Sequence, residues 1–577
     1  MDGDEEHGPD RLLDAADEAA QAFASAYTGA VARLDAPGLV AAMRKLATIR
    51  DLVHRTTVYS ELRFAADSAT AANGALVQAV KERTTAIDTR LRFFELEWIA
   101  LEAPLAERLL TGAGQALQFA AHHLRTLRAR RPYTLSEAEE RILAERRVTG
   151  EQAWARLYEE RYSATEVQLD GERVPFSAAL GQAMDPDRAR RVAAVEAMVA
   201  ATAPIGRERA YIYNTLIHDH AVEDRLRGFP TWLSSRNLEN QIEDGAVAAL
   251  VAAARARYDI PQRWYALKAS LLGVERLRTY DLYAPLETEA PPISYARARD
   301  LVCSAYHDFA PEAGAIARRF FDEAWIDAPV RAGKMGGASC ELGGEHVHPY
   351  VMLNHTGRRY DVVTMAHELG HGLHDVLAMP AGILHQHTPL TIAETASTFG
   401  EALVLQRLLD DADDDRARLG PLAEALEGSI NTIFRQVALN QFEERAHTLR
   451  RSQGELSAGQ LDQLHAEVLS EFQGEAVEEV AGAERHWAMI PHFFLWPGYV
   501  YAYAFGQLLS LSLYARYRAV GDAFVPQYLD MLRAGGSRSP KELCAIVGVD
   551  LEDPGFWATG LELVEAQLQA VETCAAV

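Results

Sequence analysis

Residues 364–375 read TMAHELGHGLHD, and their central part, 367–372, places two histidines, a glutamate and two glycines inside an apolar helical pattern. A helix that only packs against its neighbours gains nothing from these glycines, because each one costs about 1 kcal/mol relative to alanine in a helix interior. Close approach of a neighbouring chain segment or of a ligand would explain Gly370 and Gly372. The stretch therefore predicts a helix that carries a site, and such a site needs further groups from elsewhere in the chain.

His367, Glu368 and His371 form the H-E-x-x-H pattern. Two imidazoles four residues apart project from one helix face, and both can reach a single zinc ion at about 2.1 Å. Glu368 lies about 100° round the helix from His367, which places its carboxylate to accept a proton from a water on the metal. Composition alone would produce the pattern in roughly one such chain in twenty or thirty, so the prediction of one zinc ion per chain also depends on the surrounding residues.

A zinc site of this type needs a third protein ligand. The extended pattern H-E-x-x-H-x-x-G-x-x-H fails, because His374 and Leu377 stand where glycine and histidine are required. A carboxylate from a following helix is the remaining source, and Glu394 and Glu401 share a face in the stretch 388–409. We predict that Glu394 completes the zinc site and that Glu401 hydrogen-bonds a ligand histidine.

Each of these glutamates also has a purely structural interpretation. Thr391 and Glu394 have the spacing of a capping box, and Glu401 fits an exposed glutamate on a helix surface. His385 and His387 are rival zinc ligands, although they lie in a loop flanked by proline and glycine.

Composition and charge restrict the kinds of partner. The 577-residue chain has 49% hydrophobic and 24% charged residues, as expected of a soluble globular protein. Its formal net charge of −25 argues against a nucleic-acid-binding protein and against binding to an anionic membrane. The chain has no apolar run of membrane-spanning length, an acidic and polar start, and only 4 cysteines. These features predict a cytoplasmic protein that binds neither nucleic acid nor membrane.

The hydrophobic pattern predicts a predominantly α fold. Residues 12–31, LLDAADEAAQAFASAYTGAV, are typical of the long helices that we expect over the first part of the chain. Alternating residues at 165–176 predict a β-hairpin that turns at Asp170 and Gly171. Helical patterning then returns, and Pro230 predicts a kink or loop within it.

The middle of the chain has a different pattern. A glycine-rich stretch at 334–344 and a short β-type run at 349–355 predict a small sheet beside the histidine helix. The proline-rich residues 287–295 predict an internal boundary. We predict three parts, namely a disordered acidic segment over 1–10, an N-terminal helical domain over 11–185, and a domain that carries the histidine helix over 186–577.

The residues around the predicted zinc site resemble a known family. The stretch 363-VTMAHELGHGLH-374, followed by 393-AETASTFGE-401, is similar to the oligoendopeptidase F branch of the M3 (thimet oligopeptidase-like) zinc metallopeptidases. The stretches 492-HFFLWPGYVYAYAFGQ-507 and 553-DPGFWATGLELVE-565 extend the resemblance, which covers about residues 200–570.

In that family the two histidines and the first glutamate of an E-x(6)-E pair bind zinc. The resemblance therefore implies His367, His371 and Glu394 as zinc ligands, with Glu368 as the general base. It also implies a multi-helix fold around a deep central channel, which would restrict the substrates to short, unstructured oligopeptides. The activity implied is that of a metalloendopeptidase.

The segment that begins at His492 offers hydrogen-bond donors for a developing oxyanion. If Pro497 lies in the first turn of a helix, Tyr499 and Tyr503 share a face and Tyr501 points away. An aromatic core stripe would explain the same tyrosines. The family resemblance implies a histidine and tyrosines over the zinc, so we predict Tyr499 and Tyr503 as transition-state donors that His492 assists.

Gly336, Gly337 and Ala338 precede the predicted strand. The run fits a flexible turn, or an exposed backbone that pairs with an extended peptide substrate, and the family resemblance favours substrate binding. The sequence thus predicts a zinc endopeptidase of short oligopeptides. The alternatives are a carboxypeptidase-like zinc exopeptidase on the same fold and a helical peptide-binding protein whose catalytic site has degenerated.

Overall fold

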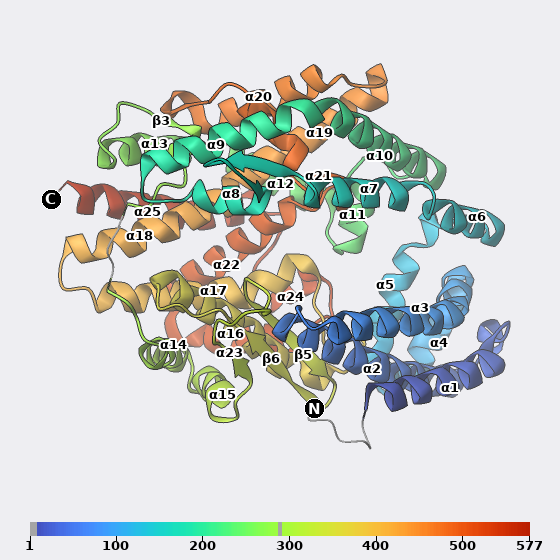
Figure 1. Cartoon of the computed structure of the whole chain (residues 1–577). Helices are drawn as coiled ribbons and strands as arrows, with labels where there is room; N and C mark the ends of the chain where they lie inside the picture. Colours follow the sequence, from blue (N-terminus) through green and yellow to red (C-terminus); the bar gives the residue numbers. More distant parts are fainter. Residues whose placement is uncertain (1–7, 287–290, 577) are drawn as a thin grey trace. The chain divides into compact units, whose positions relative to one another are not determined.

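The computed structural model describes residues 8–286 and 291–576 (Figure 1). The predominantly α fold is confirmed, since helices account for most of the described chain. The first helix, α1, begins at Pro9, so Pro9 and Asp10 of the predicted acidic segment are helical. Proline suits this position because the first helical residue needs no hydrogen-bonded N–H. The remainder of the predicted acidic segment, and part of the predicted proline-rich boundary, lie outside the described residues.

The chain forms two compact units, and each unit is assembled from separated segments. The first unit comprises Met1–Pro132, Pro291–Arg407 and Leu513–Asp550, and the second comprises Tyr133–Ala290, Leu408–Ser512 and Leu551–Val577. The predicted domain division at residue 185 stays a prediction.

Three long helices pack together at the start of the first unit (Figure 1). They are α1 (Pro9–Tyr27), α2 (Ala36–Ala66) and α3 (Ala71–Ala100). The carboxylate of Asp35 caps α2 by accepting a hydrogen bond from the N–H of Gly38. Phe23, Phe94 and Trp98 are buried where the helices meet, and these apolar contacts hold the bundle together.

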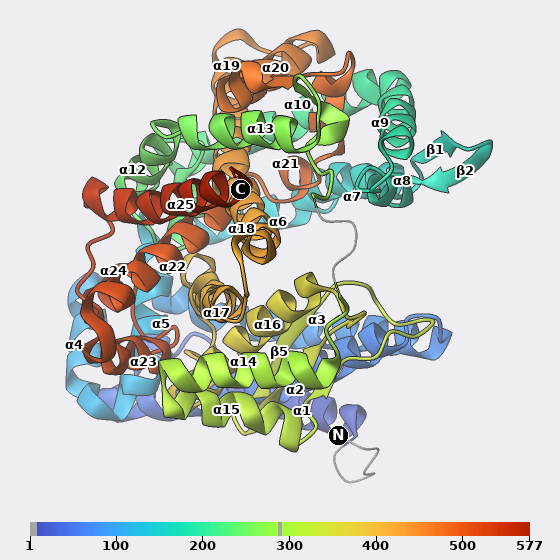
Figure 2. The same ribbon diagram turned by 90° about the vertical axis from the view of Figure 1, so that its left-hand side faces the viewer.

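The first unit contains further helices, two of which, α16 and α17, carry the predicted site. They are α4 (Ala103–Ala113), α5 (Gln118–Ala129), α14 (Tyr295–Phe309), α15 (Pro311–Asp322), α16 (Arg359–Ala378), α17 (Leu390–Asp410), α23 (Val525–Arg533) and α24 (Pro540–Ile546). The neighbouring helices α14 and α15 run side by side in Figure 2, and both pack against α16.

A three-stranded sheet lies against the histidine helix α16, as the sequence predicts. Its strands are β4 (Ile326–Asp327), β5 (Ser339–Gly344) and β6 (Val347–Met352). The order is β4-β6-β5, with β5 antiparallel to β6 and β4 parallel to it. In this register Cys340 on β5 pairs with Val351 on β6. Because β6 is the central strand, β5 lies at one edge of the sheet.

The second unit is also mostly helical. Its elements are α6 (Glu137–Arg147), α7 (Glu151–Ser163), β1 (Glu166–Leu169), β2 (Glu172–Pro175), α8 (Phe176–Gln182), α9 (Arg188–Thr202), α10 (Gly206–Arg227), α11 (Ser234–Glu239), α12 (Asp244–Arg255), α13 (Asp259–Leu271), β3 (Leu277–Arg278), α18 (Asp415–Ser429), the π-helix η7 (Ile430–Arg435), α19 (Gln436–Gln453), α20 (Ala458–Gln473), β7 (Val477–Glu478), α21 (His492–Leu495), the start of α22 (Tyr501–Val520) and α25 (Pro554–Ala575).

The predicted hairpin is confirmed as β1 and β2, which pair antiparallel beside α8 and α9 (Figure 2). Asp170 and Gly171 at its tip have φ values of 53° and 84°, the left-handed backbone that a two-residue hairpin turn requires. The predicted interruption near Pro230 is also confirmed, because α10 ends at Arg227 and Gly228 follows in a left-handed conformation.

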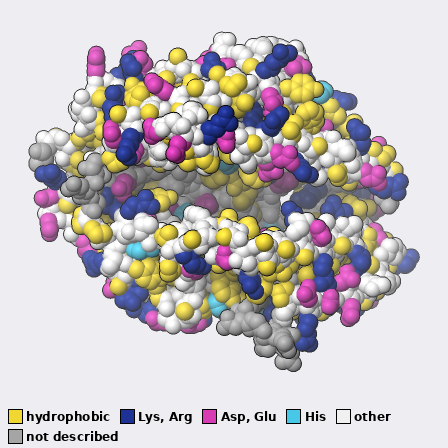
Figure 3. All heavy atoms as spheres, in the orientation of Figure 1, with side chains coloured by type: hydrophobic (Ala, Val, Ile, Leu, Met, Phe, Trp, Pro, Cys, Tyr) yellow, Lys and Arg dark blue, Asp and Glu magenta, His cyan; other side chains and the backbone are white. Residues whose placement is uncertain are grey.

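The surface carries charged side chains of both signs. Acidic and basic side chains alternate over the face shown in Figure 3, and the acidic excess is not gathered into one patch there. None of the helices in the described part of the chain is long and apolar enough to cross a membrane.

Candidate active site

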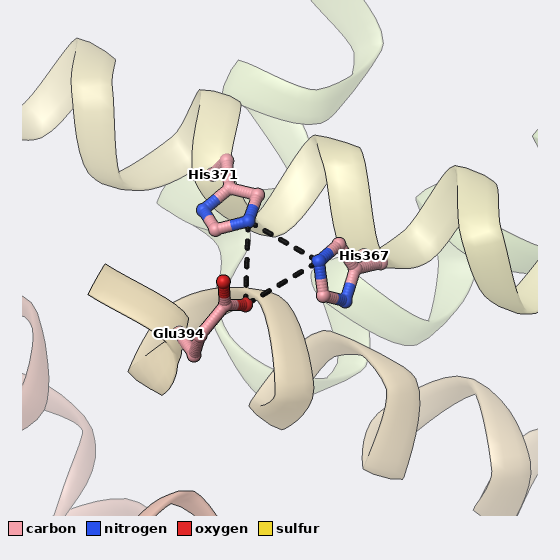
Figure 4. Close-up of side chains that lie close together, drawn as sticks. All are labelled: His367, His371 and Glu394. Atoms are coloured by element: carbon pink, nitrogen blue, oxygen red, sulfur yellow. Dashed lines mark hydrogen bonds and ion pairs between the residues drawn. The ribbon is translucent and has the colours of Figure 1, made fainter. Parts of the chain in front are cut away.

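His367 and His371 lie on the side of α16 that faces α17, which carries Glu394 (Figure 4). The other side of α16 is fixed by buried apolar residues such as Met365 and Leu369. Among the described residues, these three are the one group of histidine, cysteine or carboxylate side chains whose ligand atoms all lie within 4.8 Å of one another. The sequence-predicted ligand set is therefore brought together by two adjacent helices.

The distances between the three ligand atoms test whether a metal ion fits. Nε2 of His371 lies 3.2 Å from Nε2 of His367 and 3.5 Å from Oε2 of Glu394. Nε2 of His367 lies 3.4 Å from the same oxygen. Two ligands at about 2.1 Å from a zinc ion, at the tetrahedral angle, are about 3.4 Å apart. The three side chains thus have the separation that a tetrahedral ion requires, with a fourth position left for water or substrate.

Glu394 does not form the capping box that its spacing with Thr391 suggests. Helix α17 begins at Leu390, so Thr391 already lies inside the helix. The hydroxyl of Ser397 instead donates to Oε2 of Glu394 at 2.8 Å and fixes the carboxylate. Burial raises the pKa of Glu394, but hydrogen bonding to His371 and the charges of both histidines outweigh burial and lower it to about 2. The carboxylate is therefore ionised, as a metal ligand must be.

Glu401 lies about two turns along α17 from Glu394, on the same face, and contacts the other ring nitrogen of His367. The Nδ1–H of His367 donates to Oε1 of Glu401 at 2.5 Å, which leaves Nε2 directed at His371 and Glu394. Burial lowers the pKa of His367, but the carboxylates of Glu401 and Glu394 outweigh it and raise the pKa to about 9. This contact is the kind that orients a histidine ligand.

Glu368 is nearly buried, with 6% of its surface exposed. Burial raises the pKa of its carboxyl group, while the neighbouring His367 and His371 oppose the rise. The Glu368 carboxylate is not part of the ligand triad. A carboxylate with a raised pKa beside a metal centre has the properties of a general base.

The two glycines of the histidine helix are explained by close packing, as predicted. A Cβ added at Gly370 would lie 2.6 Å from Cα of Ser397 and even closer to the carbonyl oxygen of Ala396. A Cβ at Gly372 would overlap the ring of Phe320. Gly370 therefore allows α16 and α17 to approach closely enough for their side chains to share one ion.

Sequence reasoning missed two residues that shape this site. Ser397 holds the Glu394 carboxylate, and its spacing of three residues from Glu394 was the available signal. The hydroxyl of Tyr306 donates to the backbone oxygen of Ala366 at 2.8 Å, and only the absence of a side chain at Gly400 leaves room for the Tyr306 ring. No sequence pattern indicated that contact, because it joins distant segments.

The rival ligands are held in other contacts. Nε2 of His385 accepts the backbone N–H of His123 at 3.2 Å, and the ring of His387 packs on that of His54 with centroids 5.0 Å apart. Neither histidine belongs to the triad that the described residues form.

His492, Tyr499 and Tyr503 form a cluster in the second unit. Nε2 of His492 lies 3.0 Å from the hydroxyl oxygen of Tyr503, and the rings of Tyr499 and Tyr503 are 5.2 Å apart. Tyr501 points away, as predicted, because its buried hydroxyl accepts a hydrogen bond from Asn240 at 2.8 Å. The catalytic role of this cluster stays a prediction.

The predicted start of the tyrosine helix was wrong. Helix α22 begins at Tyr501, so Pro497 lies in a turn that precedes the helix. Gly498 follows with a φ of 71°. This left-handed conformation does not fit a right-handed helix, so the helix does not include Pro497. A Cβ at Gly498 would also lie 2.6 Å from Leu233.

Gly336 and Gly337 are exposed in the loop before β5, and a Cβ at either would meet no atom within 4 Å. The side chain of Asn354 donates to the backbone oxygens of Met335 and Gly337, each at 2.9 Å. The loop thus presents backbone that Asn354 holds in place next to the edge strand β5. Substrate binding by Gly336, Gly337 and Ala338 stays a prediction.

Glu443 on α19 anchors the turn that precedes Tyr499. Its buried Oε1 accepts the N–H of Gly498 at 2.9 Å. Burial raises the pKa of Glu443 to about 8, well above the value of 4.5 for a free glutamate. Between these two pH values Glu443 is therefore protonated in the folded state and ionised in the unfolded state.

This raised pKa predicts a pH-dependent stability. The contribution of Glu443 is fully present below pH 4.5 and is lost as the pH rises towards 8. Glu443→Gln does not titrate, so the wild type is expected to lose stability relative to the variant by up to about 1.4 kcal/mol per pH unit in that interval. Melting temperatures of both proteins between pH 5 and 9 test this expectation. Parallel curves would contradict it.

Comparison with known proteins gives consistent matches. A model of peptidase family M3 matches residues 182–563, and a model of oligopeptidase F matches residues 97–166. An oligoendopeptidase F homolog of Lactococcus lactis subsp. lactis (strain IL1403) is 24% identical over 557 residues, which cover 93% of this chain and 90% of the homolog. Oligopeptidase PepF of Bacillus subtilis (strain 168) is 28% identical over 59% of this chain and 50% of its own length.

The fold is similar to that of a solved structure. Oligoendopeptidase-F from Enterococcus faecium superposes with a TM-score of 0.75 at 21% identity, and the match covers 98% of each chain. At this identity the likeness concerns the fold alone.

Proposed function

The chain belongs to peptidase family M3, and on that basis we propose that it is a zinc-dependent endopeptidase that hydrolyses internal peptide bonds of short, unstructured oligopeptides. The observation that carries the proposal is the triad of His367, His371 and Glu394, whose ligand atoms have tetrahedral separations. Two imidazoles and a carboxylate are a ligand set of catalytic zinc sites.

The residues of the chain divide the chemical work. A zinc ion in the triad supplies Lewis acidity, which acidifies water and polarises a carbonyl group. Glu368 accepts the proton of the attacking water and then delivers it to the nitrogen of the leaving amine. Glu401 keeps the ring of His367 in one orientation throughout, through the hydrogen bond at Nδ1.

His492, Tyr499 and Tyr503 are proposed to stabilise the oxyanion that develops at the scissile carbonyl. Donors of this kind lower the barrier when they are already oriented before the reaction. The hydrogen bond between His492 and Tyr503 and the anchoring of the Gly498 turn by Glu443 supply that orientation within the second unit. Gly336, Gly337 and Ala338 are proposed to pair with the extended substrate backbone.

Metal removal gives the first test. Dialysis against a strong chelator is expected to abolish cleavage of an internally quenched peptide, and one equivalent of zinc per chain should restore it, because the triad offers a single set of ligands. The measurements are metal content by elemental analysis and cleavage rate by fluorescence. A chelated protein with unchanged activity would contradict the proposal.

The cleavage positions separate the alternatives. Mass spectrometry of the digest is expected to show internal cuts in peptides of roughly ten residues. Removal of only terminal residues would instead establish the exopeptidase. Stoichiometric zinc without cleavage of any peptide in a diverse library would favour a binding protein with a degenerate site.

A further inference from the structure

The π-helix η7 joins α18 to α19 in the second unit and borders a small pocket. π-helical turns are rare, and they occur frequently at functional sites. Three residues of η7, Ile430, Asn431 and Arg435, line the pocket, which has a volume of about 30 Å³ and is open to solvent. Trp264, Tyr265, Tyr283 and Glu427 line it as well. A pocket of this size accommodates a small polar group with little more than one water molecule.

The acidic residue of the pocket is already neutralised. The Glu427 carboxylate forms an ion pair with Lys268, whose ammonium group is buried and also donates to the backbone oxygen of Leu282 at 2.8 Å. The negative charge of Glu427 therefore compensates the positive charge of Lys268.

Arg435 has no such partner. Among the residues that the structure describes, no carboxylate lies within ion-pair distance of its guanidinium group, and no hydrogen bond joins that group to another residue. The side chain is half-exposed in the pocket. Besides burial, the positive charge of Arg435 lowers the pKa values of two histidines of the same unit, His465 and His492. A guanidinium without a counter-ion in a pocket is a ready binding group for a carboxylate.

The position of Arg435 relates this pocket to the proposed oxyanion donors. Burial lowers the pKa of His492, and the positive charge of Arg435 lowers it further, so the two groups are electrostatic neighbours. His492 in turn contacts Tyr503. Arg435 and His492 belong to the same compact unit, so an anion held by Arg435 lies in the unit that carries the segment which the proposed function assigns to the substrate.

We propose that Arg435 binds a carboxylate of the peptide substrate in this pocket, with the side-chain amide of Asn431 as a second hydrogen-bonding group. The inference rests on the proposed function, because it assumes that peptides bind beside His492. The carboxylate comes from the C-terminus of the peptide or from an acidic side chain.

Paired substrates test the inference. One internally quenched peptide is prepared with a free C-terminal carboxylate and with a C-terminal amide, and a second pair carries glutamate or glutamine at one internal position. The wild type is expected to cleave one charged form with a kcat/KM roughly ten- to hundredfold above that of its neutral partner. In Arg435→Gln that ratio should fall to about one, and Arg435→Lys should retain part of it, because lysine keeps the charge without the planar fork.

Arg445→Gln is the matched control. Arg445 also belongs to the second unit, on α19, but its guanidinium is already paired with Glu471, so this variant should keep the full preference for the charged peptide. Melting temperatures and circular dichroism of all variants establish that they are folded.

The outcomes separate the inference from the proposed function. Efficient cleavage by the wild type with no preference in either pair would overturn the role of Arg435 and leave the peptidase intact. Absence of any cleavage would overturn the proposed function, and the carboxylate site is then judged by binding. Calorimetry of the metal-free protein with both peptide pairs should show tighter binding of a charged form in the wild type alone. Equal affinities there would also overturn the inference.

Discussion

Replacing Glu368 by glutamine is expected to lower kcat/KM for peptide cleavage by a factor of about 10² to 10⁴, the usual contribution of a general base. Glutamine has nearly the same shape as glutamate and therefore fits the buried position of Glu368, of whose surface 6% is exposed. Glutamine cannot, however, accept the proton of the attacking water. Because Glu368 is not among the three ligand residues, the variant should still bind one equivalent of metal. Steady-state kinetics and elemental analysis of the same preparation give both results.

A second glutamate provides the control for this experiment. Glu323 lies at the exposed end of α15 and pairs with Arg319 on its own helix, so Glu323→Gln should leave the kinetics unchanged. If Glu368→Gln retained metal and cleaved peptides at the wild-type rate, another group would have to be the base. Loss of metal together with activity would show that Glu368 supports the ligands instead.

Replacing Gly370 by alanine is expected to weaken metal binding about ten- to hundredfold, comparable to the effect of losing a residue that orients a ligand. The added methyl group would meet the backbone of Ala396 and Ser397, and no rotamer change can relieve a contact between backbone and Cβ. Helix α17 must therefore move away from α16 and carry Glu394 away from both histidines. Overpacking of this kind also costs about 1–3 kcal/mol of stability. Competition with a chromogenic chelator and denaturant unfolding measure the two effects.

Gly428→Ala is the matched control, since Gly428 lies in α18 and a Cβ there would meet no atom within 4 Å. That variant should bind metal as the wild type does and gain up to about 1 kcal/mol of stability, because alanine has the higher helix propensity. Unchanged metal affinity in Gly370→Ala would mean that the spacing of the two helices does not determine the geometry of the triad.

Local sequence patterns were sufficient for most of the fold. The hairpin at Asp170 and Gly171 was predictable because its turn requires two left-handed residues, and few dipeptides tolerate them. The separation of His367 and His371 follows from helix geometry alone. The close approach of another chain segment to Gly370 was predictable as well. A glycine in a helix interior lowers the stability of the helix, so its presence there indicates that a larger residue would not fit.

Contacts between distant segments were not predictable in the same way. The hydrogen bond from Ser397 to Glu394 depends on side-chain orientation within α17, and the contact of Tyr306 with the backbone of Ala366 joins segments separated by 60 residues. The start of α22 was predicted near Pro497 but lies at Tyr501, because Gly498 adopts a positive φ. A glycine favours this conformation but does not require it. The division of the chain into interleaved units has no local signal.

The interleaving of the two units has a consequence for synthesis on the ribosome. The histidine helix α16 is complete at Ala378, but α23, which packs against it, ends only at Arg533. At a translation rate of about 5–20 residues per second, the helix waits roughly ten to thirty seconds for this partner. During that time the part of α16 that α23 covers is exposed on the nascent chain. The protein is therefore expected to depend on ribosome-associated chaperones until α23 has been synthesised.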